Sequence, residues 1–357
     1  MAKDIRVLIV DDSAFMRKLI SDFLNEHPNI NVIGTARNGK EAILKIKEMQ
    51  PDVVTLDVEM PEMNGLEALQ VIMKEIPTRV VMLSSTTQEG AENTFLAISY
   101  GAVDFIAKPS GPLSLDLDKV KDEIIQKVLM ASKANMKGLL NKTNQDSSLL
   151  PKKDFPKFNR TTANIHQNKL ICIGTSTGGP RALQQVLTNF PKTVNAPILI
   201  VQHMPAGFTK SLANRLDSLC HIHVKEAENG EIVQNGTAYI APGGYHMKVR
   251  KGGNHFYIYL DQTEPIGGHR PSVDLMFLSV SELKNVLKIA VLMTGMGSDG
   301  TKGLKALKSS GSTIAIAESE ESSVVFGMPK SAIATNLVDE IVHLEKIAPT
   351  IMKYMDV

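Results

Sequence analysis

Short apolar runs alternate with amphipathic helical segments in two separate blocks of this sequence, residues 1–125 and residues 169–350. This alternation is the feature that most restricts the fold. A chain that returns through a helix after each strand pairs its strands in parallel, because the crossover brings it back to the same end of the sheet. We therefore expect two α/β domains, and the length of 357 residues agrees with that number.

Both blocks contain runs with the length and composition of buried strands. In the first block the runs are Ile5–Val10, Val53–Leu56, Arg79–Leu83 and Phe105–Ala107. In the second block they are Leu170–Ile173, Ile198–Val201, Ile289–Leu292 and Thr313–Ile316. Residues 230–262 differ, because short irregular strands alternate there with Gly-rich turns. That stretch predicts an antiparallel addition to a doubly wound, mostly parallel sheet.

Residues 126–168 separate the two blocks and are rich in Lys, Asn, Thr, Ser and Gln. They hold seven Lys and one Arg against two Asp. The last helix of the first block is expected to continue into this segment as far as about residue 134. Two interpretations of the remainder stay open: a solvated linker, and a docking segment for an acidic partner surface.

Composition argues against several classes of function. The formal net charge of +1 gives no support for general binding to nucleic acid or to an anionic membrane. The longest apolar runs fall short of the roughly 18 residues that a membrane helix needs, and the first residues lack the apolar core of a signal peptide. Cys172 and Cys220 make no disulfide framework. We expect a cytoplasmic protein that is not inserted in a membrane, and a monomer, since no long exposed apolar face is evident.

Five polar side chains follow the strand-like runs of the first block. Asp11 and Asp12 come after the first run, Asp57 after the second, and Ser84 and Lys108 after the third and fourth. Ligands gather beyond the carboxyl ends of strands in an open parallel sheet, so these residues are expected to converge. Three carboxylates without a nearby His or Cys suit Mg²⁺. A hydroxyl and an ammonium beside them can hold the oxygens of a phosphoryl group.

A second group of polar residues follows the strands of the second block. The segment GTSTGGP lies between a strand and a helix, and its Gly-x-Ser-x-Gly core is typical of a turn that exposes a nucleophilic serine, Ser176. His203 ends the next strand, and Asp299 lies in a Gly-rich loop after a third. Together they supply the nucleophile, the base and the orienting acid of acyl transfer. A nucleotide site is disfavoured, because neither the Gly-x-Gly-x-x-Gly nor the P-loop pattern is present.

Three neighbouring residues compete for roles in this second group. Asp274 is an alternative acid, but it begins an apolar helical run, which favours a helix-cap role. His269 and Arg270 are candidates for contact with substrate, and structural roles are equally open. The backbone N–H groups of Thr177 and Met296 are candidates for an oxyanion hole, because they lie after the nucleophile and in the loop of the acid.

The first block resembles the receiver domain of two-component response regulators over residues 4 to about 122. The resemblance implies a flavodoxin-like fold with a five-stranded parallel sheet, phosphorylation of Asp57 by a histidine kinase, and a cis peptide bond between Lys108 and Pro109. It implies that Asp11 and Asp12 bind Mg²⁺ together with the phosphoacceptor, and that Ser84 and Lys108 sense the phosphoryl group. Phe105 stands where receivers place a switch aromatic, and a simple core role is the alternative.

The second block resembles the catalytic domain of CheB-type chemotaxis methylesterases over residues 169–350. The motifs that carry the resemblance are GTSTGGP, QHMP, APGGYHM, HRPSVD and MTGMGSDG. It implies hydrolysis of glutamate γ-methyl esters on chemoreceptors with release of methanol, and many members also deamidate receptor glutamines. The residues carry over as Ser176 nucleophile, His203 base and Asp299 orienting acid, and no cofactor is expected for the esterase reaction.

A receiver joined to a hydrolase implies control by phosphorylation, with the unphosphorylated receiver restricting access to the active site. Two other classes of protein fit the sequence less well. A binding module with a silent second domain would not require the complete Ser, His and Asp set. A transcriptional regulator would carry a short basic DNA-reading domain rather than a near-neutral α/β domain.

Overall fold

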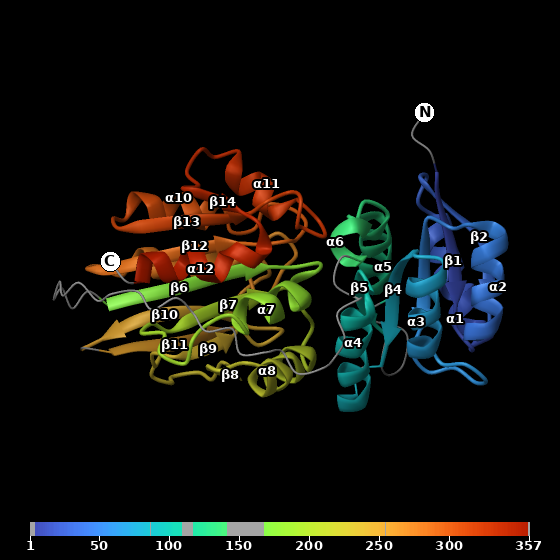
Figure 1. Cartoon of the computed structure of the whole chain (residues 1–357), viewed down its shortest axis with the longest axis horizontal. Coiled ribbons are helices and arrows are strands. Elements are labelled where there is room, and N and C mark those ends of the chain that lie inside the picture. The colour runs from blue at the N-terminus through green and yellow to red at the C-terminus, as the bar shows by residue number, and fades with distance from the viewer. Residues whose placement is uncertain (1–3, 86, 109–116, 141–167, 254, 356–357) are drawn as a thin grey trace. The chain divides into compact units, whose positions relative to one another are not determined.

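The computed structural model describes residues 4–85, 87–108, 117–140, 168–253 and 255–355 (Figure 1). Contacts divide the chain into two compact units, Met1–Leu140 and Asn141–Val357. Each unit is built around its own parallel sheet, as the alternation of apolar runs and helices predicts.

The sheet of the first unit has five parallel strands in the order β2-β1-β3-β4-β5, which confirms the flavodoxin-like prediction. The strands are β1 (Ile5–Val10), β2 (Ile30–Ala36), β3 (Val53–Asp57), β4 (Arg79–Ser84) and β5 (Asp104–Ala107). Helices α1 and α5 contact each other, and α3 packs between α2 and α4, so the two groups cover opposite faces of the sheet. The helices are α1 (Ala14–Asn25), α2 (Gly39–Met49), α3 (Gly65–Glu75), α4 (Gln88–Tyr100), α5 (Leu117–Ser132) and α6 (Met136–Leu140).

The helices of the first unit begin at polar caps. Asn64 and Glu67 form a reciprocal capping box at the start of α3, which satisfies two backbone N–H groups that have no partner within the helix. Ser13, Asn38 and Thr87 accept backbone N–H groups at the starts of α1, α2 and α4. These short side chains start each helix directly after a short turn. The polar residues in those turns therefore lie at the edge of the sheet.

The first unit extends past residue 125, the boundary that the sequence predicts. Helix α5 runs to Ser132 and α6 follows it to Leu140. Four apolar side chains keep this extension on the unit, because each of them is buried: Val128, Ala131, Ala134 and Leu139. The rest of the expected linker, residues 141–167, lies outside the described residues.

The second unit holds a seven-stranded parallel sheet in the order β14-β13-β12-β6-β7-β9-β8. A separate antiparallel pair, β10 (His246–Gly252) and β11 (His255–Asp261), is the predicted antiparallel addition. The parallel strands are β6 (Asn168–Thr175), β7 (Ile198–Gln202), β8 (His223–Glu226), β9 (Thr237–Ile240), β12 (Val286–Leu292), β13 (Thr313–Glu318) and β14 (Glu340–Val342).

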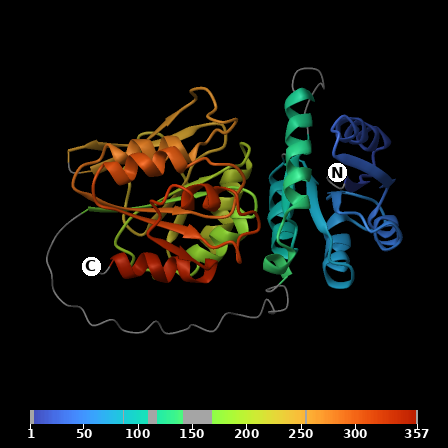
Figure 2. The same ribbon diagram turned by 90° about the horizontal axis from the view of Figure 1, so that it is seen from above.

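Strand β9 lies inside the stretch expected to be antiparallel, but it joins the parallel sheet beside β7. All four of its residues are buried, which is typical of a strand covered on both faces. Helices cover both faces of this sheet, with α9 and α10 packed together on one and α7 and α12 on the other (Figure 2). The helices are α7 (Gly179–Leu187), α8 (Phe208–Leu219), α9 (Val273–Ser281), α10 (Thr301–Ser309), α11 (Met328–Ile333) and α12 (Leu344–Met355).

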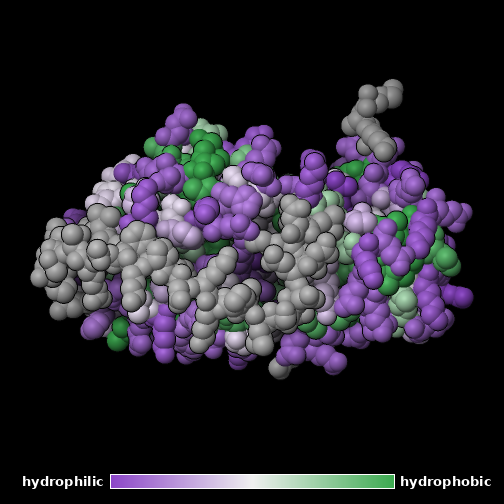
Figure 3. All heavy atoms as spheres, viewed as in Figure 1, coloured by the Kyte–Doolittle hydropathy of each residue, from purple (hydrophilic) through white to green (hydrophobic). Residues whose placement is uncertain are grey.

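The described surface is mostly polar on the face drawn in Figure 3, where hydrophobic residues form small separate clusters. Large exposed apolar side chains come from distant parts of the sequence, for example Phe15, Leu44, Leu278 and Ile341. Among the described helices, none combines the length and the apolar character needed to span a bilayer.

Candidate functional site

The five polar residues of the first block meet at one edge of the first sheet. Val10 pairs with Leu56 in neighbouring strands, so Asp11 and Asp57 emerge side by side. Carboxylate oxygens of Asp11, Asp12 and Asp57 all lie within 4.8 Å of one another. The ammonium Nζ of Lys108 lies 3.0 Å from Asp11 Oδ2 and 2.7 Å from Asp57 Oδ2. Ser84 follows Leu83, the register partner of Asp57.

Asp11 and Asp57 are buried, Asp12 is exposed, and the negative charge of the two buried carboxylates is only partly neutralised. Burial raises the pKa of Asp57 to about 6, against the lowering effect of Lys108, and the Asp11 charge raises it further. The single ammonium of Lys108 is shared between Asp11 Oδ2 and Asp57 Oδ2, so one positive charge faces two buried carboxylates. Hard, clustered oxygens with unused acceptor capacity fit a divalent cation such as Mg²⁺.

Ser84 and Phe105 lie close to this site and are held by the protein in different ways. The Ser84 hydroxyl donates to the carbonyl of Gly90 in α4 at 2.9 Å. Phe105 is 2% exposed, and the ammonium of Lys127 lies 5.1 Å from its ring centroid. Lys127 also pairs with Asp104 at 2.8 Å. Pro109 lies outside the described residues, so the expected cis bond before it does too.

Ser176 and His203 emerge side by side from the second sheet. Thr175 pairs with Gln202 in the parallel strands β6 and β7, and each of the two candidate residues follows one of these partners. The Gln202 amide nitrogen donates to the carbonyls of Ser176 and His203 at 3.0 and 3.1 Å. On the other side, Ser176 N–H donates to the carbonyl of Thr294 after β12 at 3.0 Å. The serine is therefore held from both neighbouring strands.

Glycines make room for this turn. Gly178 has φ of +79°, in the left-handed region that L side chains rarely adopt. A Cβ on Gly179 would lie 1.9 Å from Gln202 Oε1, and one on Gly295 would lie 2.8 Å from Ser176 Cβ. These close approaches explain the Gly-rich motifs around the serine and produce the tight strand-to-helix turn that the sequence predicts.

His203 is paired with Asp299, whose carboxylate is held by the start of α9. His203 Nε2 lies 2.8 Å from Asp299 Oδ2. The carboxylate also accepts the N–H groups of Val273 at 2.7 Å and Asp274 at 2.9 Å, and the hydroxyl of Ser272 at 2.9 Å. Burial alone would raise the pKa of Asp299, but the hydrogen bond from His203 and these amides lower it to about 2. Asp299 is thus an ionised carboxylate with fixed orientation.

This pairing leaves the other ring nitrogen of His203, Nδ1, available for proton transfer. Nδ1 is buried and accepts no hydrogen bond from the described residues. When Nε2 donates its proton to Asp299, Nδ1 carries the lone pair of the neutral imidazole. The residue therefore presents an unprotonated nitrogen that can accept a proton, as a general base requires.

Asp274, in the first turn of α9, and His269, which precedes that helix, have other contacts. Asp274 accepts the N–H of Gly303 in α10 at 2.7 Å, and burial raises its pKa. It does not cap its own helix as expected, because Ser272 is the N-cap residue of α9. The His269 ring stacks on His203 with centroids 3.8 Å apart and an interplanar angle of 7°.

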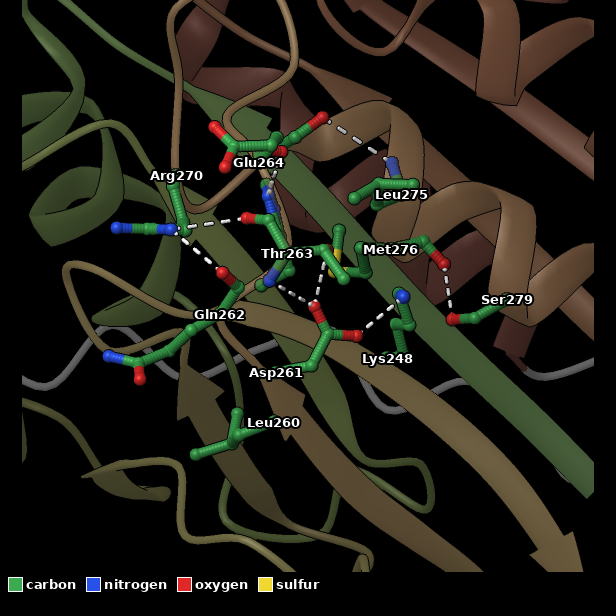
Figure 4. Close-up of polar contacts among 12 residues, drawn as sticks. Lys248, Leu260, Asp261, Gln262, Thr263, Glu264, Arg270, Leu275, Met276 and Ser279 are labelled. Carbon is green, nitrogen blue, oxygen red and sulfur yellow. Dashed lines mark hydrogen bonds and ion pairs between the residues drawn. The ribbon is translucent and has the colours of Figure 1, made fainter.

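Arg270 anchors the segment that follows the antiparallel pair (Figure 4). Its guanidinium donates to the carbonyls of Gln262 and Thr263 at 2.9 and 3.1 Å. Asp261 pairs with Lys248 at 2.5 Å and accepts the Thr263 hydroxyl at 2.6 Å. These contacts hold the stretch that leads to the histidine stacked on His203.

The two oxyanion candidates lie on chain segments that flank Ser176. Thr177 is buried, and its carbonyl accepts the Thr294 hydroxyl at 2.9 Å. Met296 is 44% exposed and follows Gly295, which packs directly against the serine. Sequence reasoning missed four residues that support this site: Gln202, Ser272, Thr294 and Glu318. Two of them, Gln202 and Glu318, are polar residues at the end of a buried strand, the same signal that singled out Asp57.

A serine on a strand-to-helix turn beside a His–Asp pair, in a parallel sheet, defines a serine hydrolase domain, and the acidic site defines a receiver domain. The chain belongs to the CheB methylesterase family. The model of the CheB methylesterase family matches residues 171–351, and that of the response regulator receiver domain matches residues 7–117. The chain is therefore a hydrolase of that family with a receiver domain at its amino end.

Similar proteins span nearly the whole chain. The protein-glutamate methylesterase/protein-glutamine glutaminase of Geobacillus kaustophilus is 60% identical over 98% of this chain and 99% of its own length. The protein of the same name from Bacillus subtilis is 50% identical over 97% of each chain. The crystal structure of the Thermotoga maritima CheB methylesterase catalytic domain is 45% identical, with a TM-score of 0.51, over 52% of this chain and 98% of that chain.

Proposed function

We propose that this chain hydrolyses glutamate γ-methyl esters on chemoreceptors and that phosphorylation of Asp57 controls the reaction. The observation that carries the proposal is the placement of Ser176 beside His203, whose Nε2 is 2.8 Å from Asp299. The names of the similar proteins, methylesterase and glutaminase, support the substrate class. The proposed setting is chemotaxis in the cytoplasm, where methylated receptor domains and their kinase are found.

The proposed reaction proceeds by acyl transfer. Ser176 Oγ attacks the ester carbonyl while His203 Nδ1 takes its proton, and Asp299 stabilises the imidazolium. Backbone N–H groups of Thr177 and Met296 would stabilise the oxyanion. When the tetrahedral intermediate collapses, the C–O bond to methanol breaks and His203 returns the proton to the leaving oxygen. Water then attacks the acyl-serine by the same route and releases the glutamate carboxylate.

The same residues would deamidate glutamine. The serine would attack the side-chain amide carbonyl, and ammonia would leave with the proton from His203. An amide has a poorer leaving group than an ester, so the glutaminase rate is expected to be lower. The glutaminase activity in the names of the similar proteins supports this second reaction.

In the receiver, a carboxylate oxygen of Asp57 would attack the phosphorus of a kinase phosphohistidine, and the histidine nitrogen would leave. Asp11, Asp12 and Asp57 would hold Mg²⁺, which neutralises charge as the anions approach. Lys108 and Ser84 would contact the remaining phosphoryl oxygens. Movement of Ser84 would end its bond to Gly90 in α4, and Phe105 is the aromatic residue proposed to respond.

Control of the hydrolase requires a change in the equilibrium between accessible and restricted forms. Moving that equilibrium from mostly restricted to mostly accessible needs a differential of about 5 kcal/mol. A phosphoryl group adds nearly two negative charges at Asp57 and several acceptor oxygens, which supply part of this free energy. The basic segment 126–168 is proposed to assist docking on acidic receptor surface, in a chain that acts as a monomer.

Methanol release from methylated chemoreceptor membranes tests this function. Wild type, Ser176→Ala and Asp57→Ala are compared, each with and without a small phosphodonor and Mg²⁺. Wild type should release methanol faster with the phosphodonor, Asp57→Ala should not respond, and Ser176→Ala should lose about 10⁴-fold or more. Equal, negligible rates for wild type and Ser176→Ala would instead indicate a binding module.

A further inference from the structure

Glu318 is a buried carboxyl group that the proposed reaction does not use. It ends β13, is 0% exposed, and forms no ion pair with any described residue. Its Oε2 accepts the backbone N–H of Thr294 at 2.8 Å, and its Oε1 accepts the hydroxyl of Ser322 at 2.9 Å. Burying an ionisable group without a cation costs free energy of folding. We therefore expect the two hydrogen bonds of Glu318 to contribute to the structure around it.

Thr294 connects Glu318 to the nucleophile turn. Its carbonyl accepts the Ser176 N–H at 3.0 Å and the Thr175 hydroxyl at 2.9 Å. Its own hydroxyl donates to the carbonyl of Thr177 at 2.9 Å and accepts the N–H of Val325 at 3.0 Å. The carbonyl and hydroxyl of this one residue therefore hold the chain before, at and after the serine, and its N–H is held in turn by Glu318.

We propose that Glu318 is a positioning residue for Ser176, acting through the amide of Thr294. Resting on the proposed function, this inference adds a residue to the serine site. The feature that matters is the reach of an acceptor oxygen to the Thr294 N–H, and the negative charge is dispensable. The bond to Glu318 holds the peptide plane between Met293 and Thr294, and this anchors Thr294 at the start of the next peptide plane, whose carbonyl accepts the Ser176 N–H.

The chemistry of the carboxyl group agrees with a role that does not need charge. Burial raises the pKa of Glu318 to about 7, while the Thr294 amide and the Ser322 hydroxyl lower it. When protonated, the group still accepts from Thr294 with one oxygen and donates to the Ser322 oxygen with the other. A glutamine has the same donor and acceptor arrangement and the same length.

Two conservative variants of the full chain separate reach from charge. Glu318→Gln keeps the reach and the acceptor but removes the charge, whereas Glu318→Asp keeps the charge and withdraws the oxygens by one methylene. The readout is the rate at which a small fluorophosphonate probe labels Ser176, located by mass spectrometry, because it needs no receptor. Thermal unfolding of each variant confirms that it is folded, and Lys288→Met serves as a control that alters another buried charged residue without contact to Thr294.

Glu318→Gln should label within about three-fold of wild type, and Glu318→Asp should label about 10- to 100-fold more slowly, since a misplacement of ~1 Å at a reacting group costs that much. The same split should appear in kcat for methanol release, with KM little changed. Slow labelling of the Gln variant, or wild-type labelling of the Asp variant, would overturn the inference while the proposed function stands. Absence of Ser176 labelling in wild type would count against the proposed function itself.

Discussion

Asp57 and Asp299 are both buried aspartates at the carboxyl edge of a parallel sheet, yet their pKa values are shifted in opposite directions. Burial raises the pKa of Asp57 to about 6, and Lys108 compensates only partly because Asp11 is also negative. Burial also disfavours the charge of Asp299, but hydrogen bonds from His203 and the start of α9 lower its pKa to about 2. The negative charge of the aspartate is thus only partly neutralised in the first unit, whereas hydrogen bonds satisfy the aspartate carboxylate in the second.

The different pKa shifts of Asp57 and Asp299 correspond to different roles of the two carboxylates. A carboxylate with unused acceptor capacity is prepared to receive something, here a divalent cation and a phosphoryl group in the proposed function. A carboxylate with every lone pair engaged can only hold a partner still, as Asp299 holds His203. Substitutions that remove one charge at each site should therefore have opposite consequences.

The largest effect is expected for Asp299→Asn. The carboxamide has the same size, but its NH₂ group would oppose the N–H donors of Val273 and Asp274, and it cannot stabilise a charged imidazolium. We expect kcat for methanol release to fall on the order of 10⁴-fold. The matched control is Asp274→Asn, on the neighbouring residue, which should cost less than about 10-fold because Asp274 contacts α10. Equal losses in the two variants would show that the sequence assignment of the acid is wrong.

The next effect is a gain of stability in the first unit on changing Asp57→Asn. The folded-state pKa of Asp57 lies above its ordinary value of 3.8, so the unfolded state loses its proton first as pH rises. Stability is therefore lost between about pH 4 and pH 6, and the loss of about 3 kcal/mol persists at pH 7. Asn carries no charge, so the Asp57→Asn variant should regain this stability at pH 7. Calorimetry of the full chain without divalent cations, at pH 4 and pH 7, measures this in the transition of the first unit.

The pH dependence of the second unit should have the opposite sign. The folded-state pKa of Asp299 is depressed, so its contribution of about 2 kcal/mol is present above pH 4 and is lost as pH falls toward 2. Asp299→Asn should accordingly destabilise the second unit more at pH 7 than at pH 2. A stabilising effect of both Asn variants at pH 7 would remove the distinction between the two sites.

The sequence predicted most of the central strands, but it missed the edge strand β2 and placed the buried strand β9 in the antiparallel stretch. Val7–Val10 and Ile198–Val201 are continuous apolar runs, whereas β2 (Ile30–Ala36) is an edge strand of mixed exposure whose polar residues and Gly34 interrupt the apolar pattern. The convergence of Ser176 and His203 followed from strand ends alone, because parallel register places them together.

The supporting residues of the serine site were not predictable in the same way. Thr294 and Ser272 act through hydrogen bonds between loops that are more than 20 residues apart in sequence, and such contacts leave no periodic signal. Glu318 did carry a signal, since an acidic residue directly after a buried run is the feature that identified Asp57. Applying that rule to every strand would have found it.

The smallest expected effect concerns the ring of His269, which stacks on His203 at 3.8 Å. The stack limits rotation of the His203 ring about an axis that Asp299 alone leaves free, because a single hydrogen bond does not fix a ring plane. His269→Ala should slow probe labelling of Ser176 by about 2- to 10-fold, the value of an aromatic pair, and His269→Phe should retain most of the wild-type rate. If the Phe variant is as slow as the Ala variant, the imidazole nitrogens of His269 contribute rather than its ring face. In that case a polar contact from His269 would have to be added to the hydrogen bonds that orient Asp299 and to the ring packing that orients His203.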